Sequence, residues 1–356
     1  MTNQETWQRI MNYEEFDRMP LFHWGEWDET KIRWIKEGFP DNVNVYDYLD
    51  VAPYFINISG INNKFFPVFE KEIIEDSKEY QVFRDTDGVT RRIKKGHSSI
   101  PQDVEYTFKT AREWLEYKKR LQPHPDRIKI TEEWELTYKK YKSPVRLVLC
   151  SLSGWLRNWM GLENMIYLTF ENPDVFEDYV QTMADLSCWI IDEVMKNHEI
   201  TIDSAQCWED MCGSGGPLID PDIFKQYVVP GYMKIRNKLD EYGIKFLAVD
   251  CDGLIEPLIR LWLDAGVNIM YPIEIGKWNA NPHQLRKKFG KELRMIGGYN
   301  KHMIEKGKSE IDKELEKRLP LMKEGGFILM PDHLITPDTP LENYKYYLEQ
   351  VRRLKF

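Results

Sequence analysis

The sequence predicts an α/β fold, a (β/α)8 TIM-like barrel with an N-terminal extension and an antiparallel β-hairpin insertion. From residue 144 onward, short apolar runs alternate with longer amphipathic segments, and the apolar runs are nearly continuous. Such runs are typical of parallel strands covered by helices on both faces. A doubly wound open sheet is the competing fold, but no Gly-rich phosphate loop follows an early strand, which favours the barrel.

The N-terminal 140 residues are irregular and are expected to supply the first strands of the barrel. Apolar runs around Leu21 and at 51–56 predict two of them. Between 69 and 95, two β-prone runs flank Asp87-Gly88, a dipeptide that favours a tight hairpin turn. An antiparallel flap that covers the site or docks a partner is therefore expected at about 69–95.

A surface helix is expected at 110–121, before the regular part of the chain. The segment opens with Thr110, and Glu113 follows at the spacing of a capping box. Its apolar and charged residues then alternate with helical period.

Six strand-helix units follow, each with an apolar run and an amphipathic segment. The strands are predicted at 145–152, 201–208, 244–250, 267–273, 293–299 and 327–333, and the helices at 173–197, 221–242, 254–265, 282–289, 309–324 and 340–354. With the two N-terminal strands this gives eight, the number that closes a (β/α)8 barrel. Residues 1–356 are expected to form one barrel domain that includes the hairpin insertion.

Composition and charge exclude several classes of function. With 49 Lys and Arg against 58 Asp and Glu, the net charge of -9 disfavours nucleic acid and anionic membranes as partners. No apolar run reaches the roughly 20 residues that span a bilayer, and the N-terminus lacks the features of a signal peptide, so a cytoplasmic location is expected. The five cysteines are expected to be reduced thiols.

Polar residues follow the apolar runs, at the strand ends where a parallel barrel builds its active site. These are His23 and Trp24, Trp208 to Asp210, Asp250 to Asp252, Glu274, Tyr299 and Asn300, and Asp332 and His333. Acidic groups at strand ends also cap helices. Glu209, Glu274 and His333 precede their helices by several residues, so capping alone does not explain the set.

Carboxylates, an imidazole and a thiol in one barrel mouth allow two kinds of chemistry. Asp, Glu, His and Cys can all ligate zinc, with an open position left for substrate. Closely placed carboxylates can instead act as acid and base, because each shifts the pKa of the other. The spacing leaves both possibilities open, and Cys251 taken alone is more often a buried small residue than a nucleophile.

Three C-terminal segments carry a family resemblance. They read DCDGLIEPLIRLWLDAGVNIMYPIEI at 250–275, LRKKFGKELRMIGGYNK at 285–301 and GGFILMPDHLITPDTPLENYKYYLE at 325–349. Together they resemble the uroporphyrinogen decarboxylase superfamily, and residues 208–232 also resemble its acidic strand end and the helix start after it. The resemblance implies a distorted (β/α)8 barrel with the site at its C-terminal mouth.

The superfamily contains cofactor-free uroporphyrinogen decarboxylases and zinc-dependent methyltransferases that move methyl groups to or from a corrinoid. The decarboxylases bind substrate propionates with two arginines in the loop after the first strand. Gly25 and Glu29 align with those arginines here, and Glu26 and Asp28 lie beside them. Since acidic side chains would repel propionates, uroporphyrinogen is not expected to be a substrate.

The methyltransferase branch implies a metal site at the ends of two strands. Aligned with its ligands, Asp250 replaces a histidine, and Asp252 and His333 replace two cysteines. Glu274 or Cys251 could complete the set. The resemblance thus implies zinc or another divalent metal, with a corrinoid carried by a partner protein.

Three functions stay open on the sequence. The first is a corrinoid-linked methyltransferase for a small methylated substrate or thiol; the second is a decarboxylase or lyase of a small acid; the third is an inactive small-molecule-binding barrel. The candidate catalytic residues are Glu209, Asp210 and Glu274, and the candidate substrate-binding residues are His23, Trp24, Trp208, Tyr271 and Tyr299. An oligomer is compatible with each function.

Overall fold

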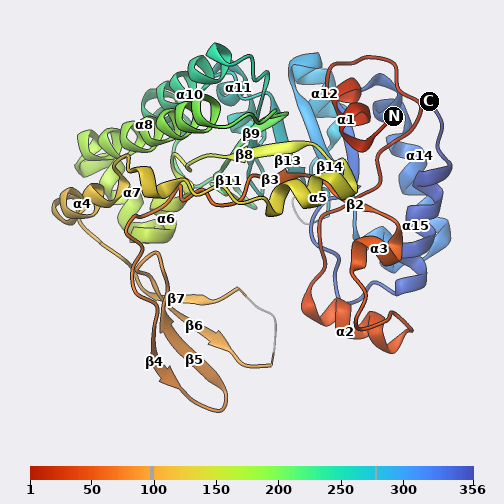
Figure 1. Ribbon diagram of the computed structural model, residues 1–356, viewed down its shortest axis with the longest axis horizontal. Helices are drawn as coiled ribbons and strands as arrows, with labels where there is room; N and C mark the ends of the chain where they lie inside the picture. Colours follow the sequence, from red (N-terminus) through yellow and green to blue (C-terminus); the bar gives the residue numbers. More distant parts are fainter. Residues whose placement is uncertain (97–99, 277–278) are drawn as a thin grey trace.

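A parallel sheet curled into a barrel wall forms the centre of the computed structural model, which describes residues 1–96, 100–276 and 279–356 (Figure 1). Within these ranges, seven strands lie in the spatial order β15-β14-β13-β12-β9-β8-β3. Their bounds are β3 (Ile56–Asn57), β8 (Val145–Val148), β9 (Ser204–Trp208), β12 (Phe246–Asp250), β13 (Ile269–Ile273), β14 (Arg294–Tyr299) and β15 (Phe327–Pro331). All these strands pair in parallel.

The remaining part of the wall comes from the N-terminal strands. β1 (Phe22–His23) pairs in parallel with β2 (Ala52–Pro53), and Glu26 forms a bridge with Ile335 beyond β15. The α/β prediction of a TIM-like barrel is confirmed.

The run at 51–56 differs from its prediction as one strand. It divides into β2, which pairs with β1, and β3, which pairs with β8. Pro53 ends β2, and because proline has no N–H to donate to a ladder, a continuous strand is unfavourable there.

Helices lie along the outer face of the parallel sheet (Figure 1). The main ones are α8 (Pro173–Asn197), α10 (Val229–Glu241), α11 (Glu256–Asp264), α12 (Pro282–Phe289), α14 (Lys308–Glu324) and α15 (Leu341–Arg353). α8 and α12 have the predicted bounds, because each begins with a proline that suits the first helical turn. None of the described helices combines the length and apolar character needed to cross a bilayer.

The end of the barrel opposite the mouth is closed by α1 (Asn3–Met11). Trp7 is fully buried and packs edge-on against Phe55 and Phe246, with ring centroids 5.6 and 5.2 Å apart. Phe246 is the first residue of β12, so this aromatic contact fills the end of the barrel opposite the mouth.

The predicted hairpin belongs to a larger antiparallel sheet of four strands. Its strands are β4 (Glu72–Asp76), β5 (Tyr80–Arg84), β6 (Thr90–Lys94) and β7 (Gln102–Glu105). Asp87-Gly88 forms the turn between β5 and β6, with Gly88 at φ +83°. The turn lies at the base of the sheet, because Val89 is fully buried and Thr107 Oγ1 donates to the Asp87 carbonyl at 2.7 Å.

The outer end of this sheet projects away from the barrel (Figure 1). α2 (Asp28–Lys36), which follows β1, projects from the same side. Both segments follow the C-terminal ends of wall strands, so they flank the mouth.

The helix predicted from the capping box is α4 (Ala111–Tyr117), followed by a 3-10 turn at Lys118–Leu121. Thr110 is its N-cap, and the reciprocal bonds between Thr110 and Glu113 are present. Trp114 anchors it, since its indole N–H donates to Asp178 of α8 at 2.8 Å.

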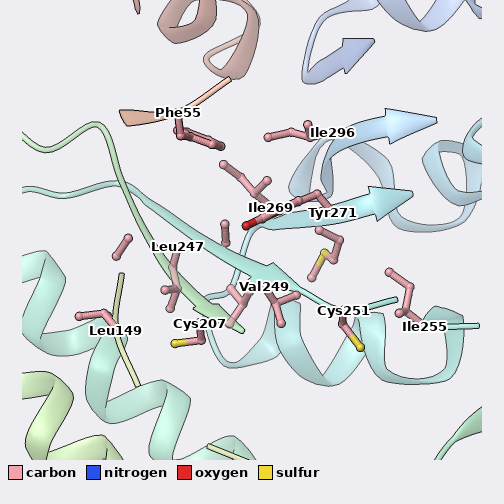
Figure 2. Packing of buried hydrophobic residues seen from close by; sticks show 14 of the residues in the cluster. Phe55, Leu149, Cys207, Leu247, Val249, Cys251, Ile255, Ile269, Tyr271 and Ile296 are labelled. Carbon is pink, nitrogen blue, oxygen red and sulfur yellow. The ribbon is translucent and has the colours of Figure 1, made fainter. Parts of the chain in front are cut away.

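Side chains of the wall strands alternate between the helices and the barrel interior. Figure 2 shows Cys207 and Cys251 turned toward neighbouring helices, whereas Phe55, Tyr271 and Ile296 point into the space that the strands enclose. This alternation decides which of the predicted site residues can reach the mouth.

Candidate functional site

Asp252, Glu274 and His333 form a triad of potential metal ligands at the mouth. One potential ligand atom of each lies within 4.8 Å of those of the other two, and Asp252 Oδ2 is 3.5 Å from His333 Nε2. The residues follow β12, β13 and β15 respectively. The predicted convergence of Asp252 and His333 is confirmed, and small side-chain movements would bring all three to the roughly 2.0–2.2 Å needed for one zinc ion.

Gly253 fixes the turn that joins two members of the triad. Its N–H donates to Glu274 Oε2 at 3.0 Å, and its φ of +89° is one that side-chain-bearing residues rarely adopt. A Cβ here would lie 2.6 Å from the carbonyl oxygen of Cys212. Only glycine therefore lets the backbone pass between Cys212 and Glu274.

Burial and like charge make the triad favourable for a cation. Burial and, to a smaller extent, the Asp252 carboxylate raise the pKa of Glu274 from 4.5 to about 7, although the Gly253 N–H and His333 partly offset the rise. A divalent cation between the carboxylates would stabilise their charged forms and so offset both the burial and the repulsion that keep this proton bound.

Asp332, next to His333, holds neighbouring loops in place. It is buried, and its Oδ2 accepts from Ile275 N at 2.8 Å and Gly276 N at 3.0 Å. Its Oδ1 accepts from Lys301 N at 3.1 Å. This carboxylate therefore joins the loops after β13 and β14 to the end of β15. The sequence identifies Asp332 as a strand-end acid but gives no sign of this positioning function.

An aromatic wall extends from the triad into the barrel. The Trp24 ring lies 5.2 Å from the His333 ring, 5.8 Å from Tyr54 and 6.2 Å from Tyr271, measured between centroids. Trp24 and Tyr271 are predicted substrate-binding residues, and the structure brings both near the triad. Tyr54 was missed, because it lies between two strands too short to show a period.

Two other candidate substrate-binding residues face away from the mouth. The Tyr299 ring is fully buried 4.7 Å from Tyr347 of α15, so it packs between sheet and helices. His23 is also fully buried, and its ring nitrogens share hydrogen bonds with Tyr344 at 2.7 Å and Glu26 at 2.6 Å. Both residues therefore have packing or hydrogen-bond contacts inside the protein, and their contact with a substrate stays a prediction.

Glu209 supports the loop before α6 (Gly154–Met160). Its buried carboxylate accepts backbone N–H groups of Leu152 at 2.8 Å, Ser153 at 2.9 Å and Gly154 at 2.8 Å. The Ser151, Ser153 and Tyr232 hydroxyls also donate to it. Through these hydrogen bonds Glu209 holds the loop before α6 in place, and its catalytic function stays a prediction.

Asp210 and Trp208 lie beside this loop. Asp210 adopts φ +46°, and its Oδ2 accepts from Arg157 Nη2 at 2.9 Å. The guanidinium carbon of Arg157 is 5.7 Å from the Trp208 ring centroid. Arg157 was not predicted, since it lies within α6 rather than at a strand end.

Asp250 and Cys251 lie outside the triad in the described structure. Asp250 Oδ2 accepts from Gln206 Nε2 at 3.2 Å. Burial and the charge of Asp252 raise the pKa of Asp250 from 3.8 to about 7, although Arg146 and Tyr271 partly offset the rise. Cys251 is fully buried on the helix side, and its Sγ accepts from Met211 N at 3.2 Å. The candidate metal ligands therefore reduce to Asp252, Glu274 and His333.

Fold and site together define a TIM-like barrel protein with a candidate metal-binding triad at its mouth. The family model for uroporphyrinogen decarboxylase (URO-D) matches residues 150–354, and the chain belongs to this family. The solved structures include a methyltransferase from Methanosarcina mazei with a TM-score of 0.60 and 13% identity, covering 99% of this chain and 98% of that one. At this identity the likeness shows the fold. Comparison with curated proteins gives no match.

Proposed function

We propose that this URO-D-like enzyme is a metal-dependent methyltransferase that moves a methyl group between a small methylated substrate or thiol and a corrinoid held by a partner protein. The observation that carries the proposal is the triad of Asp252, Glu274 and His333, which come together from three separate strand ends. The methyltransferase activity of the Methanosarcina mazei structural neighbour supports it.

The donor set fits zinc or another divalent metal. Two carboxylates and one imidazole supply oxygen and nitrogen ligands in the protein-ligand number typical of catalytic zinc sites. A bound metal would act as a Lewis acid toward the substrate heteroatom. The chain itself positions the ligands through the Gly253 N–H and Asp332, and Trp24 offers an aromatic face to a methylated group beside His333.

Metal binding is the first test. In wild-type protein loaded with zinc, we expect one ion per chain by elemental analysis. We expect Asp252→Asn, Glu274→Gln and His333→Ala each to weaken binding about 100-fold, because each removes one ligand of three. Matched controls are Asp264→Asn, Glu349→Gln and His124→Ala, at exposed positions. Zinc binding that survives all three triad substitutions would contradict the metal site.

Methyl transfer is tested separately. Methylcobalamin and a small thiol are mixed with zinc-loaded protein, and the loss of the methyl–cobalt absorbance is followed. Activity that needs the triad supports the proposal.

Glu274 also favours an alternative, since a carboxyl with a pKa of about 7 suits a general acid in the decarboxylation of a small acid. Carbon dioxide release by metal-free protein, with no methyl transfer, would favour that alternative.

A further inference from the structure

Arg146 of β8 is a buried cation that forms no ion pair with an acid in the described ranges, although the charge of Asp250 acts on it. Its side chain is 6% exposed. Nε donates to Asn57 Oδ1 at 2.8 Å, and Nη1 donates to the Tyr271 hydroxyl at 2.7 Å and the Tyr54 hydroxyl at 3.4 Å. Within the described ranges all of these acceptors are neutral, and none accepts from Nη2. A buried guanidinium ordinarily pairs with an anion, because burying its charge alone is costly.

Two further polar atoms beside Arg146 are buried without partners among the described residues. They are Ser204 Oγ and Gln206 Oε1, both on β9. Ser204 is in register with Arg146 across the β8–β9 pair, so the two residues face the same side of the sheet. Gln206 lies two residues further along and shares that face. Buried polar atoms are nearly always hydrogen-bonded, so these two atoms are suited to hydrogen-bond a ligand.

The aromatic wall connects this cluster to the triad. The Arg146 guanidinium carbon lies 5.3 Å from the Tyr54 ring and 5.9 Å from the Tyr271 ring. Both tyrosines contact Trp24, which contacts His333. A ligand running along this wall would meet the triad at one end and Arg146 at the other. Trp7 and Phe55 close the barrel at the end opposite the mouth.

We propose, resting on the proposed function, that the interior of the barrel binds the carboxylate of the substrate through Arg146 Nη2 and Ser204 Oγ–H. The substrate class is then a short acid that carries its methylated heteroatom at the other end. A single guanidinium matches one negative charge, and Asp250 nearby disfavours a dianion such as a phosphate monoester.

The test compares acids with their uncharged amides. The probes are methylthioacetate, N,N-dimethylglycine and methoxyacetate, each beside its amide, and Kd is measured by calorimetry on zinc-loaded protein. We expect at least one acid to bind about tenfold or more tightly than its amide, the range for a hydrogen bond to a charged group. Arg146→Gln should abolish this preference, and Ser204→Ala should reduce it about threefold.

Three controls keep the result interpretable. Arg260→Gln removes an exposed arginine of α11 and should leave the preference intact. Asp252→Asn tests the triad separately, because it should weaken zinc binding about 100-fold while metal-free protein still prefers the acid. If Arg146→Gln fails to fold, Arg146→Lys replaces it as a variant that keeps the positive charge. The acid-over-amide preference is then compared between the wild type and Ser204→Ala. Equal binding of acid and amide in all three pairs, a preference that survives Arg146→Gln, or a preference that Ser204→Ala leaves at its wild-type size would overturn the proposal.

Discussion

At the scale of single residues, Gly253 joins backbone geometry to the site. Gly253→Ala places a methyl group 2.6 Å from the Cys212 carbonyl oxygen at a φ of +89°. We expect it to destabilise the fold by about 1–3 kcal/mol and to weaken zinc binding by moving Glu274. Urea unfolding and zinc titration measure the two effects.

Gly243→Ala is the matched control for this substitution. Gly243 also has a positive φ, +69°, but no atom lies within 4 Å of the position that the alanine methyl group would take. The control should therefore report the backbone strain without the clash, and zinc affinity should stay unchanged. Equal effects of the two substitutions on zinc affinity would show that Gly253 does not position the triad.

Glu209 should behave as a structural carboxylate. Glu209→Gln places an amide N–H among donors, which include three backbone N–H groups and the Tyr232 hydroxyl. We expect a loss of about 2–4 kcal/mol in the free energy of unfolding, measured by urea denaturation. Glu177→Gln, at an exposed position, serves as the control. A loss below about 0.5 kcal/mol for Glu209→Gln would contradict the prediction, because ordinary surface substitutions have effects of that size.

The same residues show how far a site can be predicted from sequence. Asp252 and His333 were predictable because they follow clear apolar runs and the carboxyl ends of parallel strands share one edge. Glu209 and Cys251 follow such runs equally well. The Glu209 carboxylate binds the loop before α6, and the Cys251 side chain lies on the helix side of the sheet. The direction of each side chain depends on the path of the backbone after its strand. Arg146 lies inside its apolar run, so no pattern separates it from its neighbours.

At the scale of elements, the regular βα series was predictable and the N-terminal region less so. α8 and α12 have predicted bounds because their prolines mark the first turn. β2 and β3 contain two residues each, and two residues cannot show a period. Their place in the wall is set by tertiary pairing with β1 and β8.

The inserted sheet divides into a packed base and a free outer end. At the base, Arg91 pairs with Asp85, Asp87 and Asp103. In the outer part Ile74 is 51% exposed and Ile100 is 84% exposed. The base belongs to the hydrophobic core of the barrel, whereas the outer end offers apolar surface at the side of the mouth.

Trimming the outer end should therefore leave the barrel intact. Residues 74–82 and 92–102 are each replaced by Asn-Gly, which joins paired positions of β4–β5 and β6–β7. We expect unchanged melting temperature and zinc affinity, because Phe83, Val89 and the Arg91 pairs remain. A large loss of stability would show that the outer end is part of the core. A docking function of this surface stays a prediction, and lost binding of a corrinoid partner to the trimmed protein would support it.

At the scale of the whole molecule, the buried acids of the mouth couple folding to pH. The pKa of Glu274 is raised from 4.5 to about 7, mainly by burial. The folded protein therefore holds this proton more tightly than the unfolded chain does. The stabilisation is fully present below about pH 4.5 and is lost as the pH rises through about 7. Asp250, raised from 3.8 to about 7, acts in the same direction.

A bound metal should reverse this trend, because it stabilises the ionised carboxylates that burial disfavours. We expect the free energy of unfolding of metal-free protein, relative to Glu274→Gln, to fall between about pH 5.5 and about pH 8. Zinc should stabilise the wild type more at the higher pH, since metal ligands must be deprotonated. Urea unfolding with chelator or with zinc at both pH values measures the difference. Stabilisation by zinc that is equal at both, or equal in Glu274→Gln, would show that the ion binds away from the triad.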